Sequence, residues 1–264
     1  MKQANFLFYS VNVKAASWAR VYLNDLPLHA QKAPGVDSHS TSINQMLLDG
    51  ENALTVDVLA APEERGAGAV SVHFYTVIDP MTKPMKISTV HLFSFPEVLD
   101  TGEGPKDRRV PYHHESRFTF DNGGFSPIWA SAPAEDEVDC RGTPALRAAV
   151  TELYESIERL DVDKFVDLCE LRLSEYERAH PGVSQARADT RRDALRELFS
   201  YKPRLPPLDM SALHFASRAN GRVVHVSRED GGYVLNAPAE RDPRRRLKAD
   251  LLYTRHLGAW RIWG

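Results

Sequence analysis

The stretch that decides the fold is Thr143–Glu177, which reads TPALRAAVTELYESIERLDVDKFVDLCELRLSEYE. Thr143 and Pro144 predict the start of a helix, because a threonine hydroxyl caps the first turn and a proline at the first helical position has no amide proton to lose. Apolar residues then recur at spacings of four and three, which places them on one helix face. They are Leu146, Val150, Leu153, Ile157 and Leu160.

Asp161 is expected to end this helix and to cap a second one. The second helix has its own apolar face, formed by Val162, Phe165, Leu168 and Cys169. A third, more polar helix is predicted over Ala188–Phe199.

The hydrophobic period changes from 3.6 to two after these helices, which predicts strands. Asn220-Gly221 has the chemistry of a tight hairpin turn between Leu213–Ala219 and Arg222–Arg228. Further strands are predicted over Tyr233–Asn236, Leu247–His256 and Trp260–Trp263. Helices followed by an antiparallel meander indicate an α+β domain.

The N-terminal part shows short strand patterns separated by Gly and Pro loops, which is typical of an all-β sandwich. The clearest patterns are residues 4–13, Trp18–Leu23, Leu54–Leu59, Ala69–Ile78, Met85–Pro96 and Val110–Phe120. Asn52 is expected to hold the backbone of a turn, a structural role that we favour over ligand contact. The segment around it, SINQMLLDGENALTVDVL at residues 42–59, resembles the corner of jelly-roll sandwiches. That resemblance implies a sandwich and no particular ligand.

The domain boundary is predicted near residue 140, because residues 126–144 are rich in Pro, Ala, Ser and acidic residues. This gives a β-sandwich over residues 1–139 and an α+β domain over residues 140–264. The first part has 11 Lys/Arg and 18 Asp/Glu, a net of −7, and the second has 22 and 18, a net of +4. Opposite signs favour contact with each other or with a charged partner. The net charges of −7 and +4 are too small to indicate binding to nucleic acid.

The C-terminal half resembles the nuclear-transport-factor-2-like (SnoaL-like) superfamily over residues 145–264. The likeness rests on ERLDVDKFVDL at residues 158–168 and on the closing pattern LLYTRHLGAWRIW at residues 251–263. It implies a cone of helices packed on a curved sheet, which serves some members as an enzyme pocket and others for binding proteins. It also implies a homodimer through the C-terminal sheet. Residues 174–211, with Pro203, Pro206 and Pro207, depart from the pattern, which puts an open cone in doubt.

An enzyme with this fold would need acid–base residues inside the cone. The candidate catalytic residues are Tyr154, His214, His225 and Tyr253. Tyr233, Asp161 and Asp250 are weaker candidates, because Asp161 is explained as a helix cap and Asp250 is expected on a solvated strand face. None of these residues forms a recognisable catalytic motif.

The run Glu240–Lys248, ERDPRRRLK, contains the candidate binding residues Arg244, Arg245 and Arg246. Guanidinium groups can grip a phosphate or an acidic protein surface, although such a run is more often a solvated loop. We expect neither a metal nor a cofactor. The adjacent pair His113-His114 points to opposite faces of a strand, whereas His73 and His91 lie on neighbouring strands and could converge with one of that pair. Six histidines in the N-terminal part can also cluster by chance, which we favour, and Cys140 and Cys169 fit no metal motif.

Three functions remain open. The first is a non-catalytic protein that binds another protein, one form of which is a bacterial toxin-neutralising (immunity) protein. The second is a small-molecule isomerase or hydrolase that uses the cone. The third is a carbohydrate-binding module with Trp18, Tyr22 or Trp129 as a stacking platform. We expect a cytoplasmic protein without a membrane span, because no apolar run approaches the roughly 20 residues that a spanning helix needs.

Overall fold

The computed structural model describes the chain except for residues 1–6, 16–17, 31–36, 61–69, 79–85, 96–110, 136–138, 181–184 and 243. The chain divides into two compact units, residues 1–126 and 127–264. Counted over these units, Lys/Arg and Asp/Glu number 11 and 14 in the first and 22 and 22 in the second, which gives net charges of −3 and 0. The acidic residues between 135 and 139 therefore account for most of the charge difference that a boundary at 140 suggests.

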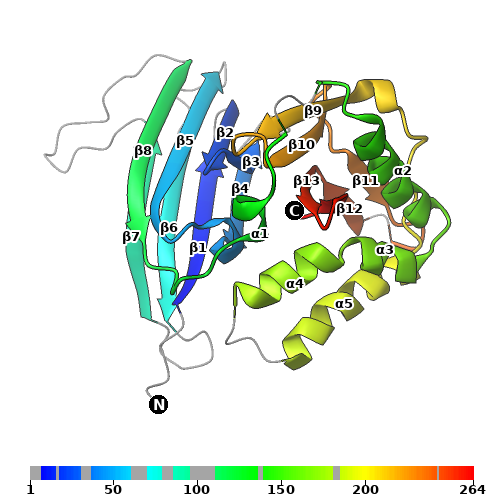
Figure 1. The fold of residues 1–264 in the computed structure, drawn as a ribbon, viewed down its shortest axis with the longest axis horizontal. Coiled ribbons are helices and arrows are strands. Elements are labelled where there is room, and N and C mark those ends of the chain that lie inside the picture. Colours follow the sequence, from blue (N-terminus) through cyan, green and yellow to red (C-terminus); the bar gives the residue numbers. More distant parts are fainter. Residues whose placement is uncertain are drawn as a thin grey trace, which may run out of the picture. The chain divides into compact units, whose positions relative to one another are not determined.

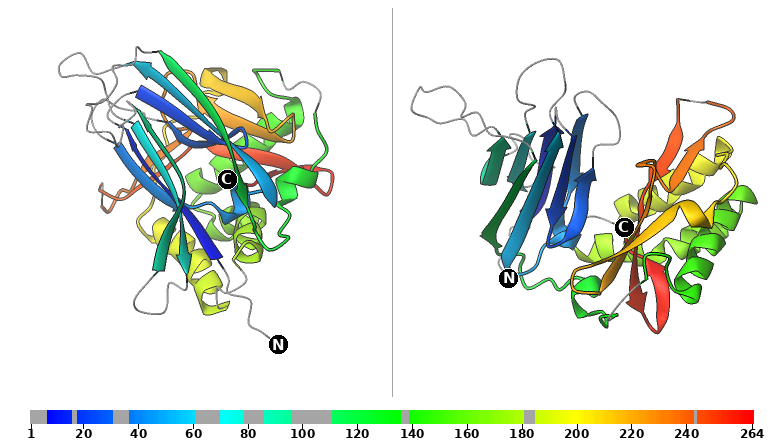
Figure 2. Two further views of the ribbon diagram at one scale, coloured as in Figure 1. Left: turned by 90° about the vertical axis from the view of Figure 1, so that its left-hand side faces the viewer. Right: turned by 90° about the horizontal axis from the view of Figure 1, so that it is seen from above.

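The first unit contains two four-stranded antiparallel sheets, with strand orders β4-β1-β6-β7 and β3-β2-β5-β8 (Figures 1 and 2). Side chains of the two sheets touch, as Phe74 of β6 and Phe118 of β8 do with ring centroids 5.1 Å apart. Buried residues alternate along the strands, which explains why the apolar pattern of period two formed strands. The elements are β1 (Leu7–Ala15), β2 (Trp18–Leu23), β3 (Leu26–Ala30), β4 (Asp37–Ser42), η1 (Asn44–Met46), β5 (Gly50–Ala60), β6 (Val70–Ile78), β7 (Lys86–Phe95) and β8 (Tyr112–Phe120).

Two asparagines hold the turns at one end of this unit. Asn24 and Asp25 have φ angles of 53° and 65°, as the hairpin turn between β2 and β3 requires. The Asn52 side chain accepts a hydrogen bond from the Leu48 amide at 2.8 Å and another from Asn24 Nδ2 at 2.8 Å. It also donates to the Leu48 carbonyl at 2.9 Å. The structural role predicted for Asn52 is confirmed.

Two edge strands carry irregularities. The pairing of β7 with β6 shifts between Phe74 and Tyr75, which leaves Val90 as an extra residue. The pairing of β3 with β2 shifts at Leu28, next to Pro27. Such bulges bend a strand locally.

The helices of the second unit begin at the predicted caps. The Leu146 amide donates to the Thr143 hydroxyl at 3.3 Å, and the Lys164 amide donates to Asp161 Oδ1 at 3.1 Å. A further break at Cys169 divides the second predicted helix. The helices are α1 (Ile128–Ser131), α2 (Pro144–Glu158), α3 (Val162–Leu168), α4 (Glu170–Arg178) and α5 (Gln185–Ser200).

Leu160 does not belong to the apolar stripe, contrary to the prediction. Its φ is 54° and its exposed fraction is 38%. The Asp161 amide donates to the Ser156 carbonyl and the Leu160 amide to the Ile157 carbonyl. This pair of bonds is a Schellman motif, which ends a helix by placing one residue in the left-handed conformation and turning it outward.

The C-terminal sheet is antiparallel with the order β14-β13-β10-β9, and the helices pack against one of its faces (Figure 1). A separate two-stranded sheet pairs β11 with β12. No helix among the described residues is both long and apolar enough to cross a membrane. The remaining elements are η2 (Met210–Ala212), β9 (Leu213–Arg218), β10 (Val223–Arg228), β11 (Leu235–Pro238), β12 (Arg246–Ala249), β13 (Leu251–His256) and β14 (Ala259–Ile262).

The single strand predicted over Leu247–His256 is wrong, because the chain breaks at Asp250. Residues before the break pair with β11, whereas those after it pair with β10 and β14. Asp250 Oδ1 accepts a hydrogen bond from the Val234 amide at 3.4 Å. The side chain of the break residue thus helps to hold the start of the neighbouring hairpin.

Residues 127–142 are tied to the second unit. The Ile128 amide donates to the buried Glu175 carboxylate at 2.7 Å, and the Trp129 ring meets Trp263 edge-on at 6.3 Å. The Glu135 amide donates to the Gly221 carbonyl at 3.0 Å, and Arg255 Nε donates to the Glu135 carboxylate at 2.8 Å. Ile128, Trp129 and Glu135 are therefore structural parts of the C-terminal unit.

Candidate functional site

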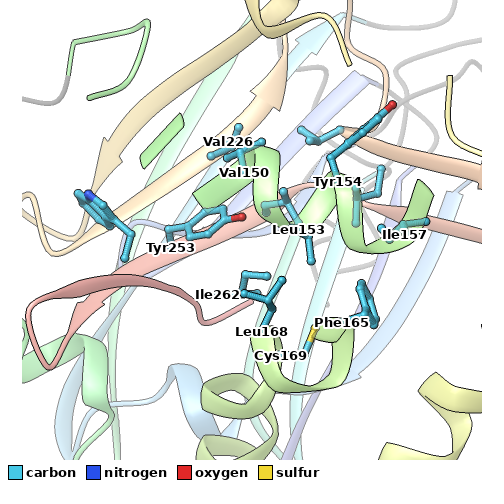
Figure 3. Close-up of a cluster of buried hydrophobic side chains, with 14 of the residues drawn as sticks. Val150, Leu153, Tyr154, Ile157, Phe165, Leu168, Cys169, Val226, Tyr253 and Ile262 are labelled. Carbon is cyan, nitrogen blue, oxygen red and sulfur yellow. The ribbon is translucent and has the colours of Figure 1, made fainter. Parts of the chain in front are cut away.

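Tyr154 and Tyr253 lie in the hydrophobic core between the helices and the sheet (Figure 3). The Tyr154 hydroxyl donates to the Pro206 carbonyl, and the Tyr253 hydroxyl donates to the Ala149 carbonyl at 3.4 Å. Burial raises the pKa of both hydroxyl groups. Both side chains are thus neutral hydrogen-bond donors at physiological pH, and they belong to a cluster of aliphatic and aromatic residues.

His214 and His225 lie on the opposite face of the same sheet. His214 alternates with the core residues Leu213 and Phe215, and His225 alternates with Val224 and Val226. Because successive side chains of a strand point to opposite faces, both histidines face away from the two tyrosines. The four catalytic candidates are therefore not brought together in one site.

Asp250 is less solvated than expected. His225 Nε2 lies 3.7 Å from Asp250 Oδ2, and the two side chains are only 12% and 18% exposed. That separation is longer than a hydrogen bond. The geometry gives a partly buried histidine–carboxylate pair at the place where the strand breaks. The other weak candidate, Tyr233, has Lys248 Nζ 5.7 Å from its ring centroid.

The histidines of the first unit have polar or aromatic neighbours. His73 Nε2 lies 2.7 Å from Thr89 Oγ1, and His91 Nε2 lies 3.1 Å from Ser116 Oγ. His113 contacts Asp57 at 2.7 Å and Glu115 at 3.1 Å, and its pKa is raised by these hydrogen bonds, chiefly that to Asp57. Within the described part of the chain, no group of three or more His, Cys, Asp or Glu residues is arranged to hold a metal ion.

Arg244, Arg245 and Arg246 lie at the turn and on the first residue of β12 in the β11–β12 hairpin, and all three are exposed. The Ala239 amide donates to the Arg245 carbonyl at 2.9 Å, and the Arg245 amide donates to the Asp242 carbonyl at 2.9 Å. Backbone hydrogen bonds therefore fix the position from which these side chains project.

A second segment, residues 201–204, lies beside this hairpin. Pro203 forms a bridge with Ala239, the Glu240 amide donates to the Lys202 carbonyl at 3.0 Å, and the Arg204 amide donates to the Pro238 carbonyl at 3.0 Å. It adds Lys202 and Arg204 to the basic side chains of the hairpin. We call the combined area the basic hairpin surface, and its members are Lys202, Arg204, Arg241, Arg244, Arg245, Arg246 and Lys248.

Carboxylates compensate part of this charge. Glu240 lies 2.9 Å from Arg204, Asp242 lies 3.1 Å from Arg244, and Glu197 lies 3.3 Å from Arg245. Seven basic side chains against three carboxylates leave a net charge of +4. The Arg244 side chain is 92% exposed and the Arg245 guanidinium lies 4.2 Å from the Tyr201 ring centroid. The surface thus combines bidentate donors with an aromatic face, a combination that suits contact with carboxylates.

Lys202, Arg204, Arg241 and Lys248 were not among the candidate residues named from the sequence. Lys202 and Arg204 are separated from Arg244 by about 40 residues of chain. The proline-rich stretch around Pro203 gave no strand signal, since proline lacks the amide proton that a ladder uses. Arg241 and Lys248 could have been found, because both lie in the same basic run, Glu240–Lys248.

The aromatic residues considered for carbohydrate stacking are also separated. Trp129 is buried against Trp263 in the second unit, whereas Trp18 and Tyr22 lie on β2 in the first. Trp18 is 38% exposed and Tyr22 is half-buried. Trp129 is therefore not a stacking platform in this structure.

Comparison with known proteins adds no assignment. The chain matches no family model, no curated protein and no solved structure.

Proposed function

We propose that the protein is a non-catalytic binding protein that recognises an acidic surface of another protein through the basic hairpin surface. The proposal rests on one observation. Basic side chains gather on the β11–β12 hairpin and on residues 201–204, whose backbones are held together by hydrogen bonds. Exposed arginines held on a fixed backbone lose less conformational freedom when they bind carboxylates. Acidic protein surfaces present carboxylates in the geometry that a guanidinium group matches.

The overall charge favours a protein partner over nucleic acid. The whole chain carries −3, whereas the seven basic and three acidic residues at the basic hairpin surface give +4. A nucleic-acid-binding domain usually has a strongly basic composition. A small positive area on a neutral unit instead supports selective contact with one acidic patch.

Within this proposal, the first unit is a β-sandwich and the second a nuclear-transport-factor-2-like cone used for binding. The order of helices followed by an antiparallel sheet supports the second assignment. A bacterial immunity protein acting in the cytoplasm is one form of this function, because neutralising a toxin requires a complementary surface and no chemistry. The enzyme alternative is disfavoured, since Leu153, Phe165 and Phe215 are buried together in the space that a substrate would need.

Reversing the charge of Arg244, Arg245 and Arg246 tests the proposal. The full-length protein and the R244E/R245E/R246E variant are used to capture proteins from the native lysate, and the selectively captured protein is purified. Its dissociation constant, measured by calorimetry, is expected to rise at least about 100-fold in the variant, because like charges then face each other. Binding by the unchanged protein should weaken as salt is added.

The matched control reverses three exposed arginines elsewhere in the same unit, R147E/R159E/R172E. It has the same net charge as the test variant and should bind within about threefold of the unchanged protein. The proposal is overturned when no captured protein distinguishes the two variants, or when the control loses binding equally.

A further inference from the structure

The β11–β12 hairpin has one edge that the chain covers and one that it leaves open (Figure 2). Residues 201–204 lie along β11, where Pro203 forms a bridge with Ala239 and the Arg204 amide donates to the Pro238 carbonyl at 3.0 Å. In the described part of the chain, β12 pairs with β11 alone, and no backbone hydrogen bond outside that pairing involves Lys248. We call the side of residues 246–249 that faces away from β11 the open edge.

The register shows which backbone groups point towards the open edge. The Ala239 amide donates to the Arg245 carbonyl at 2.9 Å, so these two residues form a hydrogen-bonded pair next to the strands. Hydrogen-bonded and non-hydrogen-bonded pairs alternate along an antiparallel ladder. Lys248 lies three positions after Arg245 and falls in a non-hydrogen-bonded pair, so its amide and carbonyl point away from β11. The Pro238 carbonyl follows the same alternation, since it accepts its hydrogen bond from outside the hairpin.

The side chains of β12 alternate between the core and the solvent. Leu247 and Ala249 pack against the hydrophobic core of the second unit, whereas Arg246 and Lys248 are exposed. A strand added at the open edge has one face level with the two cations and the other level with Leu247. Opposite charges directly across a strand pair are stabilising, and like charges are destabilising. The edge therefore suits a strand in which acidic and apolar residues alternate.

Charge also decides between the possible occupants of the open edge. A second copy of β12, paired antiparallel, would bring the Arg246 and Lys248 side chains of the two copies against each other, which is unfavourable. Lysine on an edge strand generally protects that edge from further pairing. An acidic segment reverses this effect, because it places a carboxylate opposite each cation. The net charge of +4 at the basic hairpin surface adds to the attraction.

We propose that the acidic partner binds as an extended segment of alternating acidic and apolar residues, which adds an antiparallel strand to the open edge of β12. This inference rests on the proposed function, since it specifies how the basic hairpin surface takes its partner. Backbone hydrogen bonds supply part of the affinity, and the side chains supply the selectivity. The four residues of β12 span about 13 Å, so the paired segment is short.

Synthetic peptides test the proposal on the full-length protein. The probe is the acetylated and amidated heptapeptide EVEVEVE, and calorimetry measures its dissociation constant. In an antiparallel pair, the glutamate opposite Lys248 directs its own amide at β12. N-methylation of the glutamate amides should raise the dissociation constant at least about tenfold, because each lost hydrogen bond costs about fivefold. N-methylation of the valine amides, which face away from β12, should change it less than about threefold.

A matched pair of variants tests the edge from the side of the protein. K248P and K248Q remove the same charge, but only K248P removes the outward amide and places a proline ring at the edge. Proline is tolerated on an edge strand where its nitrogen faces solvent. K248P should bind the probe at least about tenfold more weakly than K248Q does. Circular dichroism checks that both variants fold, and if K248P does not fold, the methylated peptides decide the matter.

The outcomes separate this inference from the proposed function. If both methylated peptides bind like the probe and R244E/R245E/R246E binds none of them, the surface recognises charge without adding a strand. That result overturns the inference and leaves the proposed function standing. The inference is also overturned by a probe that does not bind, by equal binding to folded K248P and K248Q, or by a loss confined to the valine-methylated peptide. The proposed function fails separately, through the proteins captured from the lysate.

Discussion

His180 is a buried histidine at the end of α4. Its Nδ1 donates a hydrogen bond to the Tyr176 carbonyl at 2.7 Å, and its ring stacks on the Tyr176 ring at 3.9 Å. Burial lowers the pKa of His180 to about 4, and the nearby positive charge of Arg191 contributes. The folded protein therefore holds this imidazole neutral over a range in which the unfolded chain protonates it.

This difference predicts a loss of stability in mild acid. Between its unfolded pKa of 6.5 and its folded pKa of about 4, the unfolded state binds more protons, so the free energy of unfolding falls as the pH falls. The contribution of His180 between about pH 7.5 and pH 5 is about 2 kcal/mol. Urea denaturation at the two pH values measures it. In H180N, which keeps a donor for the Tyr176 carbonyl, that part of the pH dependence should disappear. If the free energy of unfolding depended equally on pH in H180N and in the unchanged protein, the loss of stability in acid would come from groups other than His180.

At the scale of the element, the hairpin between β9 and β10 depends on a glycine for two separate reasons. Gly221 has a φ of 83°, in the left-handed region, and a Cβ at this position would lie 2.4 Å from the Glu135 carbonyl oxygen. The hairpin turn and Glu135 therefore approach more closely than any residue other than glycine would permit.

Two glycine-to-alanine changes separate these reasons. G231A alters a glycine with a φ of 75° and nothing within 4 Å of the added Cβ, so it should cost only the backbone strain of about 1 kcal/mol. G221A has similar strain and also the steric conflict with Glu135. We expect it to lower the free energy of unfolding by at least about 1 kcal/mol more than G231A does. If chemical denaturation gave the same loss of unfolding free energy for G221A and G231A, the backbone at Glu135 would have moved away from the added Cβ at no measurable cost.

Elements set by local chemistry could be predicted from the sequence. The caps at Thr143 and Asp161 each depend on residues within four positions, and both are confirmed. The apolar stripe of α2 was also correct as far as Ile157. The prediction for Leu160 was wrong. The spacing of apolar residues does not reveal a Schellman motif, in which the residue in the left-handed conformation turns outward.

Elements and sites set by distant contacts could not be predicted in this way. The break at Asp250 depends on pairing with β11, which the alternation of Leu247–His256 does not reveal. β3 and β4 were missed because one contains Pro27 and the other, DSHSTS, has no apolar alternation. The same limit applied to the candidate site. Arg244–Arg246 could be named from composition, whereas Lys202 and Arg204 join them only through the bridge at Pro203.

At the scale of the whole molecule, the segment of residues 127–139 decides where the second unit begins. Trp129 is buried against Trp263, Ile128 is bonded to Glu175, and Glu135 is bonded to Gly221 and Arg255. The Glu175 side chain is buried, and this burial raises the pKa of its carboxyl group. An acidic, proline-containing composition thus marks a segment that is packed at specific points.

This packing predicts different behaviour for two truncated proteins. A fragment of residues 127–264 retains these contacts, whereas a fragment of residues 140–264 loses them and exposes Trp263. We expect the shorter fragment to be less stable by at least about 3 kcal/mol, the usual cost of removing a buried tryptophan. Thermal and urea unfolding followed by circular dichroism make the comparison. If the two fragments were equally stable, the contacts made before residue 140 would add nothing to the stability of the second unit.

The bulges at Val90 and Leu28 have a consequence for how the protein behaves at high concentration. The outermost strand of a sheet offers unpaired amide and carbonyl groups, and a flat regular edge recruits further chains into fibrils. The extra residue in β7, and the extra residue beside Pro27 in β3, interrupt that repeat on one edge of each sheet. Growth by adding strands is thereby discouraged at these two edges.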